Sequence, residues 1–174
     1  YLITDGNGGF STATAVITVA PVNDAPDVTP LPNRDNLDGD AISIPAGAQF
    51  SDRDSAALQF SATGLPAGLL IDRNTGVISG TIAPGASQPN GGVYSVTVTA
   101  DDGNGGITSI SFVWSVANPG PTANDDLAST TEDNPVTIPV LTGLGADVDP
   151  DGDVLTVTTA SAPNGTVVIN ANGT

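Results

Sequence analysis

The sequence predicts an all-β protein built from tandem β-sandwiches, each with a Greek-key order of about seven strands. Hydrophobic residues make up 39% of the chain, and most are Val, Ile, Leu and Ala in alternating runs. The chain also contains 21 Gly and 14 Pro, which divide these runs into short segments. Short alternating strands joined by Gly- and Pro-rich turns are typical of sandwiches and barrels.

The charge balance excludes several classes of function. The chain has 19 acidic and 3 basic residues, and its formal net charge is -16. Three Arg residues cannot neutralise a run of phosphates, so we predict no binding to nucleic acid. Anionic membrane surfaces are disfavoured for the same reason. No apolar run approaches the roughly 18 residues of a membrane span, so we predict no membrane insertion.

The residue types that are absent also limit the chemistry. The chain contains no His, Cys or Met, which removes the commonest acid–base group, thiol nucleophiles and thiolate metal sites. Paired Asp residues can hydrolyse glycosides, but here they cluster in loops that suit metal binding, so we predict that the protein is not an enzyme. The lack of Met and Cys suits an oxidising exterior. The chain starts at Tyr1 without a signal peptide, and we expect a fragment of a longer protein.

The sequence repeats with a period of 97 residues. The segment Asp5–Gly9 recurs identically at Asp102–Gly106. At the same offset, the pair Asp52 and Asp54 aligns with Asp149 and Asp151. This period matches an immunoglobulin-like sandwich of ~100 residues. We therefore divide the chain into a closing β-hairpin of one repeat (1–20), a complete repeat (22–117) and the N-terminal part of the next (118–174). The joints are short and Pro-rich, which is typical of stiff spacers.

Seven strands are expected in the complete repeat, each with boundaries good to a few residues. They lie near 27–32, 41–45, 57–63, 69–72, 76–81, 92–100 and 107–116. We expect a further strand at 11–19 in the first unit. Alternation places Tyr94, Val96 and Val98 on the inner face of the sixth strand. Phe112 and Trp114, on the seventh, are predicted to lie in the core.

The antiparallel topology brings distant acidic segments together. The start of the first strand, the loop after the second and the loop before the last lie at one end of such a sandwich. In the complete repeat this pole receives Asn23, Asp24, Asp52, Asp54, Asp101, Asp102 and Asn104. The third unit supplies Asn124, Asp125, Asp149, Asp151 and Asp153, and the first unit supplies Asp5 and Asn7. We expect Asp35, Asp38 and Asp40 to be solvated turn residues.

A cation explains this crowding of carboxylates. Like charges repel unless a cation compensates them, and oxygen ligands without nitrogen or sulfur select a hard cation. A high oxygen number in irregular loops favours Ca²⁺. Two alternatives remain open. Asp-Gly and Asn-Gly are turn signals on their own, and Asp52 and Asp54 could form a surface cluster with an ion pair to Arg53.

Particular segments resemble known bacterial repeats. Residues 65–69, 71–72 and 74–81 are similar to the dystroglycan-type cadherin-like, or putative-Ig, repeat, and the resemblance covers 22–117. Residues 124–126, 131–133, 149–153 and 163–166 resemble the related bacterial cadherin-like repeat, and 1–19 resembles its closing hairpin.

The resemblance implies a Ca²⁺-rigidified array of sandwiches on a bacterial cell surface, often in secreted RTX-type adhesins. It assigns the linker acids to Asp24 and Asp125, the paired acids to Asp52 with Asp54 and Asp149 with Asp151, and the closing-loop acids to Asp102 and Asp5. The family usually continues Gly-Asp after the pair, as Gly152-Asp153 does. The complete repeat has Ser55-Ala56 instead, which implies a weaker site there.

Three functions follow as hypotheses. The first is a structural or adhesive segment of a large extracellular protein, with adjacent repeats as partners. The second is head-to-tail assembly, in which the 1–20 hairpin of one copy docks into the 118–174 unit of another. The third is a carbohydrate-binding accessory module, with a glycan or surface protein as ligand. The third is the weaker because aromatic residues make up only 4% of the chain.

Overall fold

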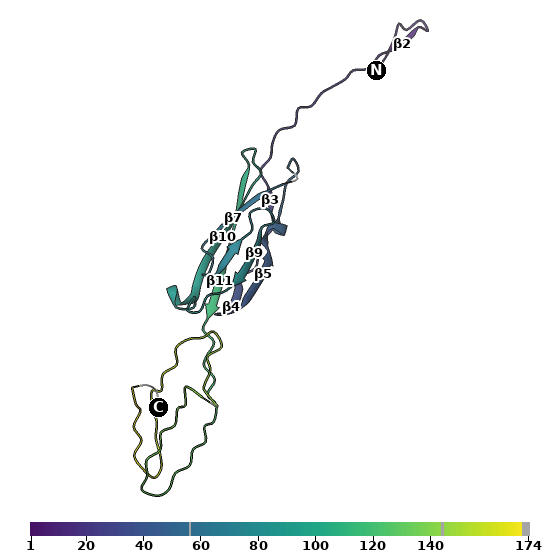
Figure 1. Cartoon of the computed structure of the whole chain (residues 1–174). Helices are drawn as coiled ribbons and strands as arrows, with labels where there is room; N and C mark the ends of the chain where they lie inside the picture. The colour runs from purple at the N-terminus through teal and green to yellow at the C-terminus, as the bar shows by residue number, and fades with distance from the viewer. Residues whose placement is uncertain (56, 144, 172–174) are drawn as a thin grey trace.

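The computed structural model describes residues 1–55, 57–143 and 145–171, and within them it contains no α-helix. Two short 3-10 turns, η1 (Ala46–Gln49) and η2 (Pro89–Gly92), are the helical elements of this part. Ala56 of the predicted Ser55-Ala56 departure, and the last three residues of the predicted third unit, lie outside the described residues. Figure 1 shows a hairpin, a sandwich and an irregular C-terminal part in a row. The all-β prediction is confirmed.

The central sandwich consists of a four-stranded and a three-stranded sheet, with a short β-ribbon beside them. The first sheet has the order β4-β11-β10-β7, the second β5-β9-β8, and the ribbon pairs β3 with β6. The strands are β3 (Asp27–Val28), β4 (Arg34–Leu37), β5 (Ala41–Pro45), β6 (Phe50–Ser51), β7 (Gln59–Thr63), β8 (Leu69–Ile71), β9 (Val77–Thr81), β10 (Val93–Asp101) and β11 (Ile107–Ala117).

One strand is shorter than predicted and two were not predicted. The expected strand at 27–32 ends at Val28, because Pro30 and Pro32 cannot donate backbone hydrogen bonds to a ladder. The chain then forms β4, which runs parallel to the end of β11, with Arg34 opposite Trp114. The second unpredicted strand, β6, has only two residues and pairs with β3.

The core lies between the two sheets and follows the predicted alternation. Val96, Val98 and Ala100 on β10 are fully buried, and so is Trp114 on β11. The Trp114 indole Nε1 donates a hydrogen bond of 3.1 Å to Asn36 Oδ1. Phe112 is also buried. The core prediction for Phe112 and Trp114 is therefore confirmed, and neither ring is available as a sugar-stacking platform.

Asp38 differs from the prediction that it is a solvated turn residue. Only 4% of its surface is exposed, and Ser87 N donates to its carboxylate at 3.0 Å. The turn folds under the loop that follows β9, since Gly39 N donates to Ile82 O. Burial of the Tyr94 phenol, together with the charge of Asp38, raises the pKa of Tyr94. The hydropathy of the sequence could not show that the loop after β9 covers this polar turn.

The first and third units have little regular structure among the described residues. The hairpin pairs β1 (Leu2–Thr4) with β2 (Phe10–Thr12), and the strand expected at 11–19 ends at Thr12. All side chains from Tyr1 to Ala25 are exposed, so this segment has no second sheet to pack on. In the third unit, the described residues form one isolated bridge, between Thr122 and Val148.

Candidate metal centre

The repeated Asp-Gly-Asn-Gly-Gly loop has the same conformation in both copies. Asp102 Oδ1 accepts hydrogen bonds from Asn104 N at 2.6 Å and from Gly106 N at 3.0 Å. Asp5 Oδ1 accepts the equivalent bonds at 2.8 and 2.9 Å. In each loop the Asp backbone N–H also donates to the carbonyl of the fifth residue, at 3.1 and 3.2 Å. The five-residue motif therefore specifies its own turn, as the turn alternative expected.

Three distant segments meet at the N-terminal pole of the sandwich. Asn23 Nδ2 donates to Asp102 Oδ2 at 2.7 Å, which ties the linker before β3 to the β10–β11 loop. The Asp24 backbone N–H donates to Asp54 Oδ2 at 2.9 Å, which ties the same linker to the loop between β6 and β7. The structure thus brings these predicted residues together, in direct contact through hydrogen bonds.

Ser55 and Asn104 close this network. The Asn104 side-chain amide donates to Ser55 Oγ at 3.1 Å and so links the last two loops. Ser55 stands where the resemblance expects Gly, and no pattern in the sequence indicates this role. Asp101 accepts a bond from Gly103 N inside its own loop, and in the described part of the chain no hydrogen bond joins it to the acids of the other loops.

Hydrogen bonds from the linker and from its own loop stabilise the ionised carboxylate of Asp102. The Asn23 side-chain amide and the loop N–H groups hold the pKa of Asp102 below its usual range, and Asp102 is only 6% exposed. Asp52 is different: its Oδ1 accepts bonds from Asp54 N and Ser55 N, but its buried Oδ2 has no partner. Arg53 forms no ion pair with Asp52 or Asp54, contrary to the surface-cluster alternative.

The second junction repeats the tie between linker and loop. Asn124 N donates to Asp147 Oδ1 at 2.8 Å, and Asn124 Nδ2 donates to Ala146 O at 2.9 Å. The Thr122–Val148 bridge continues this pairing. In the sandwich, Asp27 pairs with Ser51, which lies 97 residues before Val148. The linker of the third unit therefore lies directly beside the loop that carries the acidic residues.

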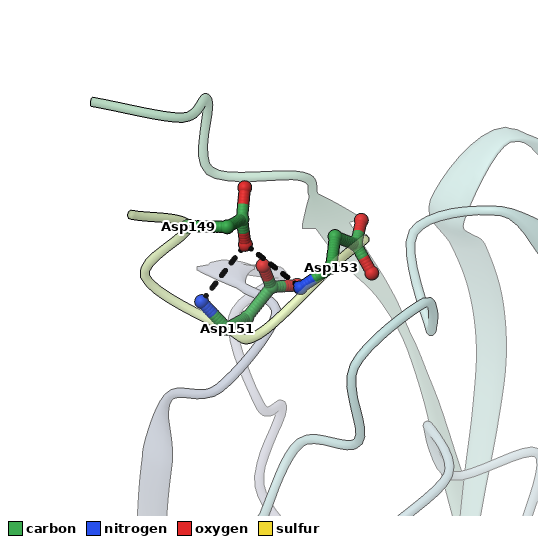
Figure 2. A group of neighbouring side chains, drawn as sticks. All are labelled: Asp149, Asp151 and Asp153. Atoms are coloured by element: carbon green, nitrogen blue, oxygen red, sulfur yellow. Dashed lines mark hydrogen bonds between the residues drawn. The ribbon is translucent and has the colours of Figure 1, made fainter. Parts of the chain in front are cut away.

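Asp149, Asp151 and Asp153 form the tightest acidic group among the described residues. One carboxylate oxygen from each lies within 4.8 Å of the others. Figure 2 shows the three side chains around a single loop. Asp149 Oδ1 accepts bonds from the backbone N–H groups of Asp151 and Asp153, at 3.2 and 3.1 Å, and from the intervening Gly152 at 3.1 Å. These bonds fold the loop so that the three carboxylates converge.

Asp151 is the unusual member of this group. Both of its carboxylate oxygens are buried and accept no hydrogen bond from a backbone or amide donor. A proton shared with Asp149, burial, and the charges of Asp149 and Asp153 raise the pKa of Asp151 to about 6. The same shared proton lowers the pKa of Asp149. The electrostatics therefore favour adding a positive charge to this loop.

The acidic loop also lies against the sandwich. A Cβ atom placed on Gly39, in the turn between β4 and β5, would lie 3.4 Å from Asp151 Cβ. The group is thus located at the contact between the second and third units. Its donor set contains only oxygen, which fits a hard divalent cation. Asp125 is not part of the group, and Asp5 and Asn7 lie apart on the β1–β2 hairpin (Figure 1).

The chain belongs to the putative Ig domain family, whose model matches residues 20–117. Residues 118–174 match the bacterial Ig domain model. Together they define a tandem array of Ig-like repeat domains, and the predicted fold class is confirmed. Residues 149–153 lie in the second match. The resemblance to the putative-Ig repeat is confirmed as well.

Among solved structures, the chain is similar to cadherin ectodomains. It is 19% identical to Drosophila N-cadherin EC1-4, with a TM-score of 0.45, over 73% of this chain and 34% of that chain. The human desmocollin-1 ectodomain is 13% identical, with a TM-score of 0.44, over 75% and 26%. A putative alpha-galactosidase from Bacteroides fragilis is 26% identical, with a TM-score of 0.41. That match covers 57% of this chain and only 19% of the galactosidase.

The comparison with curated proteins gives no match. In the part of the chain that the structure describes, no helix has the length and apolar character needed to span a bilayer.

Proposed function

We propose that this chain is a structural or adhesive repeat segment of a large extracellular bacterial surface protein, and that Ca²⁺ bound at its domain junctions makes the segment rigid. The proposed units are a closing hairpin (1–20), a complete repeat (22–117) and the N-terminal part of the next (118–174). The membership in Ig-like repeat families supports the array. The hydrogen-bonded linkers at both junctions support a fixed order of loops around each one.

One observation carries the cation proposal: both carboxylate oxygens of Asp151 are buried between two other acids without a hydrogen-bond donor. A buried carboxylate without a partner is costly, and a second carboxylate beside it increases the cost. A divalent cation in the loop removes both penalties. It bonds the free oxygens and neutralises the repulsion among the three acids.

Calcium fits this loop better than magnesium. Mg²⁺ requires near-ideal octahedral geometry and keeps most of its water, whereas Ca²⁺ accepts six to eight oxygens in irregular arrangements. The loop offers three carboxylates from one short turn, with the β4–β5 turn of the sandwich beside it. The N-terminal pole has one free buried oxygen, on Asp52, so we expect weaker binding there.

Calcium titration by calorimetry tests the proposal. We expect Asp151→Asn to weaken Ca²⁺ binding at the strongest site at least about tenfold, because ligand charge sets affinity in such sites. Asp72→Asn is the matched control. Like Asp149 in the acidic loop, Asp72 accepts bonds from backbone N–H groups two and three residues ahead, at 2.9 and 2.7 Å, but it lies in the exposed β8–β9 turn. Equal binding by the parent chain and Asp151→Asn would refute the site.

A further inference from the structure

A short turn at the C-terminal end of the sandwich contacts the third unit. It joins β4 to β5 and consists of Asp38, Gly39 and Asp40, and we call it the docking turn. A Cβ atom placed on Gly39 would lie 3.4 Å from Asp151 Cβ and 3.8 Å from Asp151 Cα. These are the distances of van der Waals contact. The acidic loop, residues 149–153, therefore lies directly against this turn.

Backbone hydrogen bonds fix the docking turn to the body of the sandwich. Gly39 N donates to Ile82 O at 3.0 Å, and the N–H of this fully buried Ile82 donates to Asp40 O at 2.9 Å. Asp38 N donates at 3.0 Å to the carbonyl of Ala117, the last residue of β11. The turn is thus anchored on two sides, next to the linker that leads into the third unit.

Side-chain hydrogen bonds hold the two carboxylates of the turn in place. Asp40 Oδ2 accepts a bond from Asn36 Nδ2 at 2.8 Å, and Asn36 in turn accepts the indole N–H of the buried Trp114. Ser87 N donates to both oxygens of the buried Asp38, at 3.0 and 3.2 Å. Neither carboxylate can move away from the junction without breaking these bonds.

Gly39 permits the close approach of the two units. Its φ is +82°, a backbone conformation that favours glycine, and its missing side chain leaves room for the acidic loop. A side chain longer than a methyl group would meet that loop. The 97-residue repeat does not include this turn, because Pro135, Val136 and Thr137 stand at the equivalent positions. Sequence periodicity therefore gives no indication of it.

The contact brings like charges together. The turn contributes Asp38 and Asp40, and the loop contributes Asp149, Asp151 and Asp153. Like charges repel, and at physiological ionic strength the repulsion acts over a Debye length of about 8 Å. A divalent cation would leave the three carboxylates of the loop with a net charge of -1 instead of -3. It would thereby remove most of the repulsion between loop and turn.

We propose that the docking turn is the surface of the sandwich that receives the acidic loop, and that the charge of this loop controls the contact. The junction closes when a cation neutralises the loop and opens when the cation is removed. The role of the cation rests on the proposed function, whereas the docking turn rests on the packing of Gly39 against Asp151. Closure gives the third unit a second point of attachment besides the linker, which limits bending between the two units.

Distances between two spin labels measure this closure in the whole chain. The chain has no Cys, so Leu70→Cys and Leu127→Cys together provide two specific labelling sites. The Leu70 side chain is 76% exposed on β8, and the Leu127 side chain is 98% exposed in the third unit. We expect one narrow distance distribution in saturating Ca²⁺ and a broad one in EDTA at low salt.

Gly39→Leu tests the packing of the turn against the loop. The added side chain occupies the space of the acidic loop, so the distribution should stay broad in Ca²⁺. Calorimetry should still detect Ca²⁺ binding, because the three acids belong to the third unit. Gly85→Leu is the control, since Gly85 has a φ of +76° but Gln88 Cγ, the nearest atom to its Cβ position, is 3.9 Å away. A Gly39→Leu variant that narrows in Ca²⁺ as the control does would overturn the docking turn.

Asp40→Asn tests the charge without a change of backbone. It keeps an oxygen that can accept the bond from Asn36, but it removes one charge from the turn. In EDTA its distribution should be narrower than that of the parent chain. Asp72→Asn removes the same charge beyond the far end of the β5–β9 pair and should behave like the parent. Equal distributions in the two variants would contradict control by charge.

Salt separates this inference from the proposed calcium site. Raising NaCl in EDTA from about 0.01 M to about 1 M shortens the Debye length from about 30 Å to about 3 Å, so the junction should close without calcium. A parent chain that binds no Ca²⁺ but closes at high salt would refute the proposed function and support the docking turn. A parent chain that binds Ca²⁺, yet stays broad both in Ca²⁺ and at high salt, would overturn the inference and leave the calcium site standing.

Discussion

Asp102 and Asp5 hold the same position in two copies of one loop, yet only Asp102 is bound by a second segment. Both accept two backbone N–H bonds from their own loop. Asp102 also accepts the Asn23 amide, which belongs to a segment 79 residues away. A comparison of Asp5 with Asp102 therefore separates the effect of the hydrogen bonds within the loop from the effect of the contact with the linker.

We expect Asp102→Ala to lower the melting temperature of the sandwich by several degrees, because three donors lose a buried acceptor. Asp5→Ala should leave it unchanged. The pKa of Asp102 is lowered by folding, so its stabilisation is present at neutral pH and is lost as the pH falls through the folded-state pKa, below about 4. Thermal melts from pH 7 to pH 2 measure this. A constant difference between parent and Asp102→Ala down to pH 2 would contradict the assignment.

Asp151 should titrate unlike the other acids. In EDTA, we expect the carboxyl ¹³C shift of Asp151 to titrate near pH 6, while Asp72, whose pKa is lowered by bonds from Thr75 and Asn74, titrates below its usual range. Because the folded state holds this proton more tightly, the cation-free junction loses stability as the pH rises from about 4 to about 6. Calcium should displace the proton. A normal pKa for Asp151 in EDTA would contradict the crowding of the loop.

Sequence reasoning predicted which acidic segments lie together at the N-terminal pole, but not which groups compensate their charges. The 97-residue repeat and the expected sandwich topology predicted that Asn23, Asp54 and Asp102 lie at one pole, because the antiparallel order of strands determines which loops are neighbours. It could not show that hydrogen bonds satisfy Asp102, since that depends on side-chain positions. It also missed the burial of Asp38, which follows from a loop folding over a polar turn.

At the scale of the element, the strands that alternate clearly were predictable and the short ones were not. The predicted strand at 41–45 is β5, and 76–81 and 107–116 differ from β9 and β11 by one residue. The two-residue strands β3 and β6 carry no periodic pattern. The expected strand at 11–19 alternates as well as any other, but it pairs only as far as Thr12 and joins no sheet within the described residues. An alternating sequence pattern indicates that a segment is able to form a strand, but tertiary contacts decide whether it pairs with a neighbouring strand.

Gly68, before β8, tests how tightly the three-stranded sheet is packed. Its φ is +89°, and a Cβ atom there would lie 2.0 Å from Thr81 O. Gly85 has a similar φ of +76°, but the nearest atom to its Cβ position is Gln88 Cγ at 3.9 Å. We expect Gly68→Ala to destabilise the sandwich by about 2–4 kcal/mol and Gly85→Ala by about 1 kcal/mol. Urea unfolding measures both. Equal losses of stability in the two variants would mean that backbone strain at positive φ, rather than a steric clash of the added Cβ atom, causes the destabilisation.

At the scale of the whole molecule, we expect calcium to oppose the repulsion that the net charge produces. A charge of -16 repels itself, most strongly where acids gather at the junctions. We expect Ca²⁺ to raise the thermal stability and to narrow the distribution of interdomain distances in small-angle scattering, relative to EDTA. The Asp151→Asn variant should lose most of this response, and Asp72→Asn should keep it. Scattering profiles that are identical with and without calcium would contradict the proposed rigidification.

The parallel pairing of β4 with β11 has a mechanical consequence. The ladder joins Arg34–Leu37, near the start of the sandwich, to Trp114–Ala117 at its end. When the two ends of the sandwich are pulled apart, we expect these strands to be loaded lengthwise and to slide against each other. Their bonds then share the load and must break together, whereas an unzipping geometry would break them one by one. We therefore expect this four-residue ladder to resist tension on the sandwich in shear.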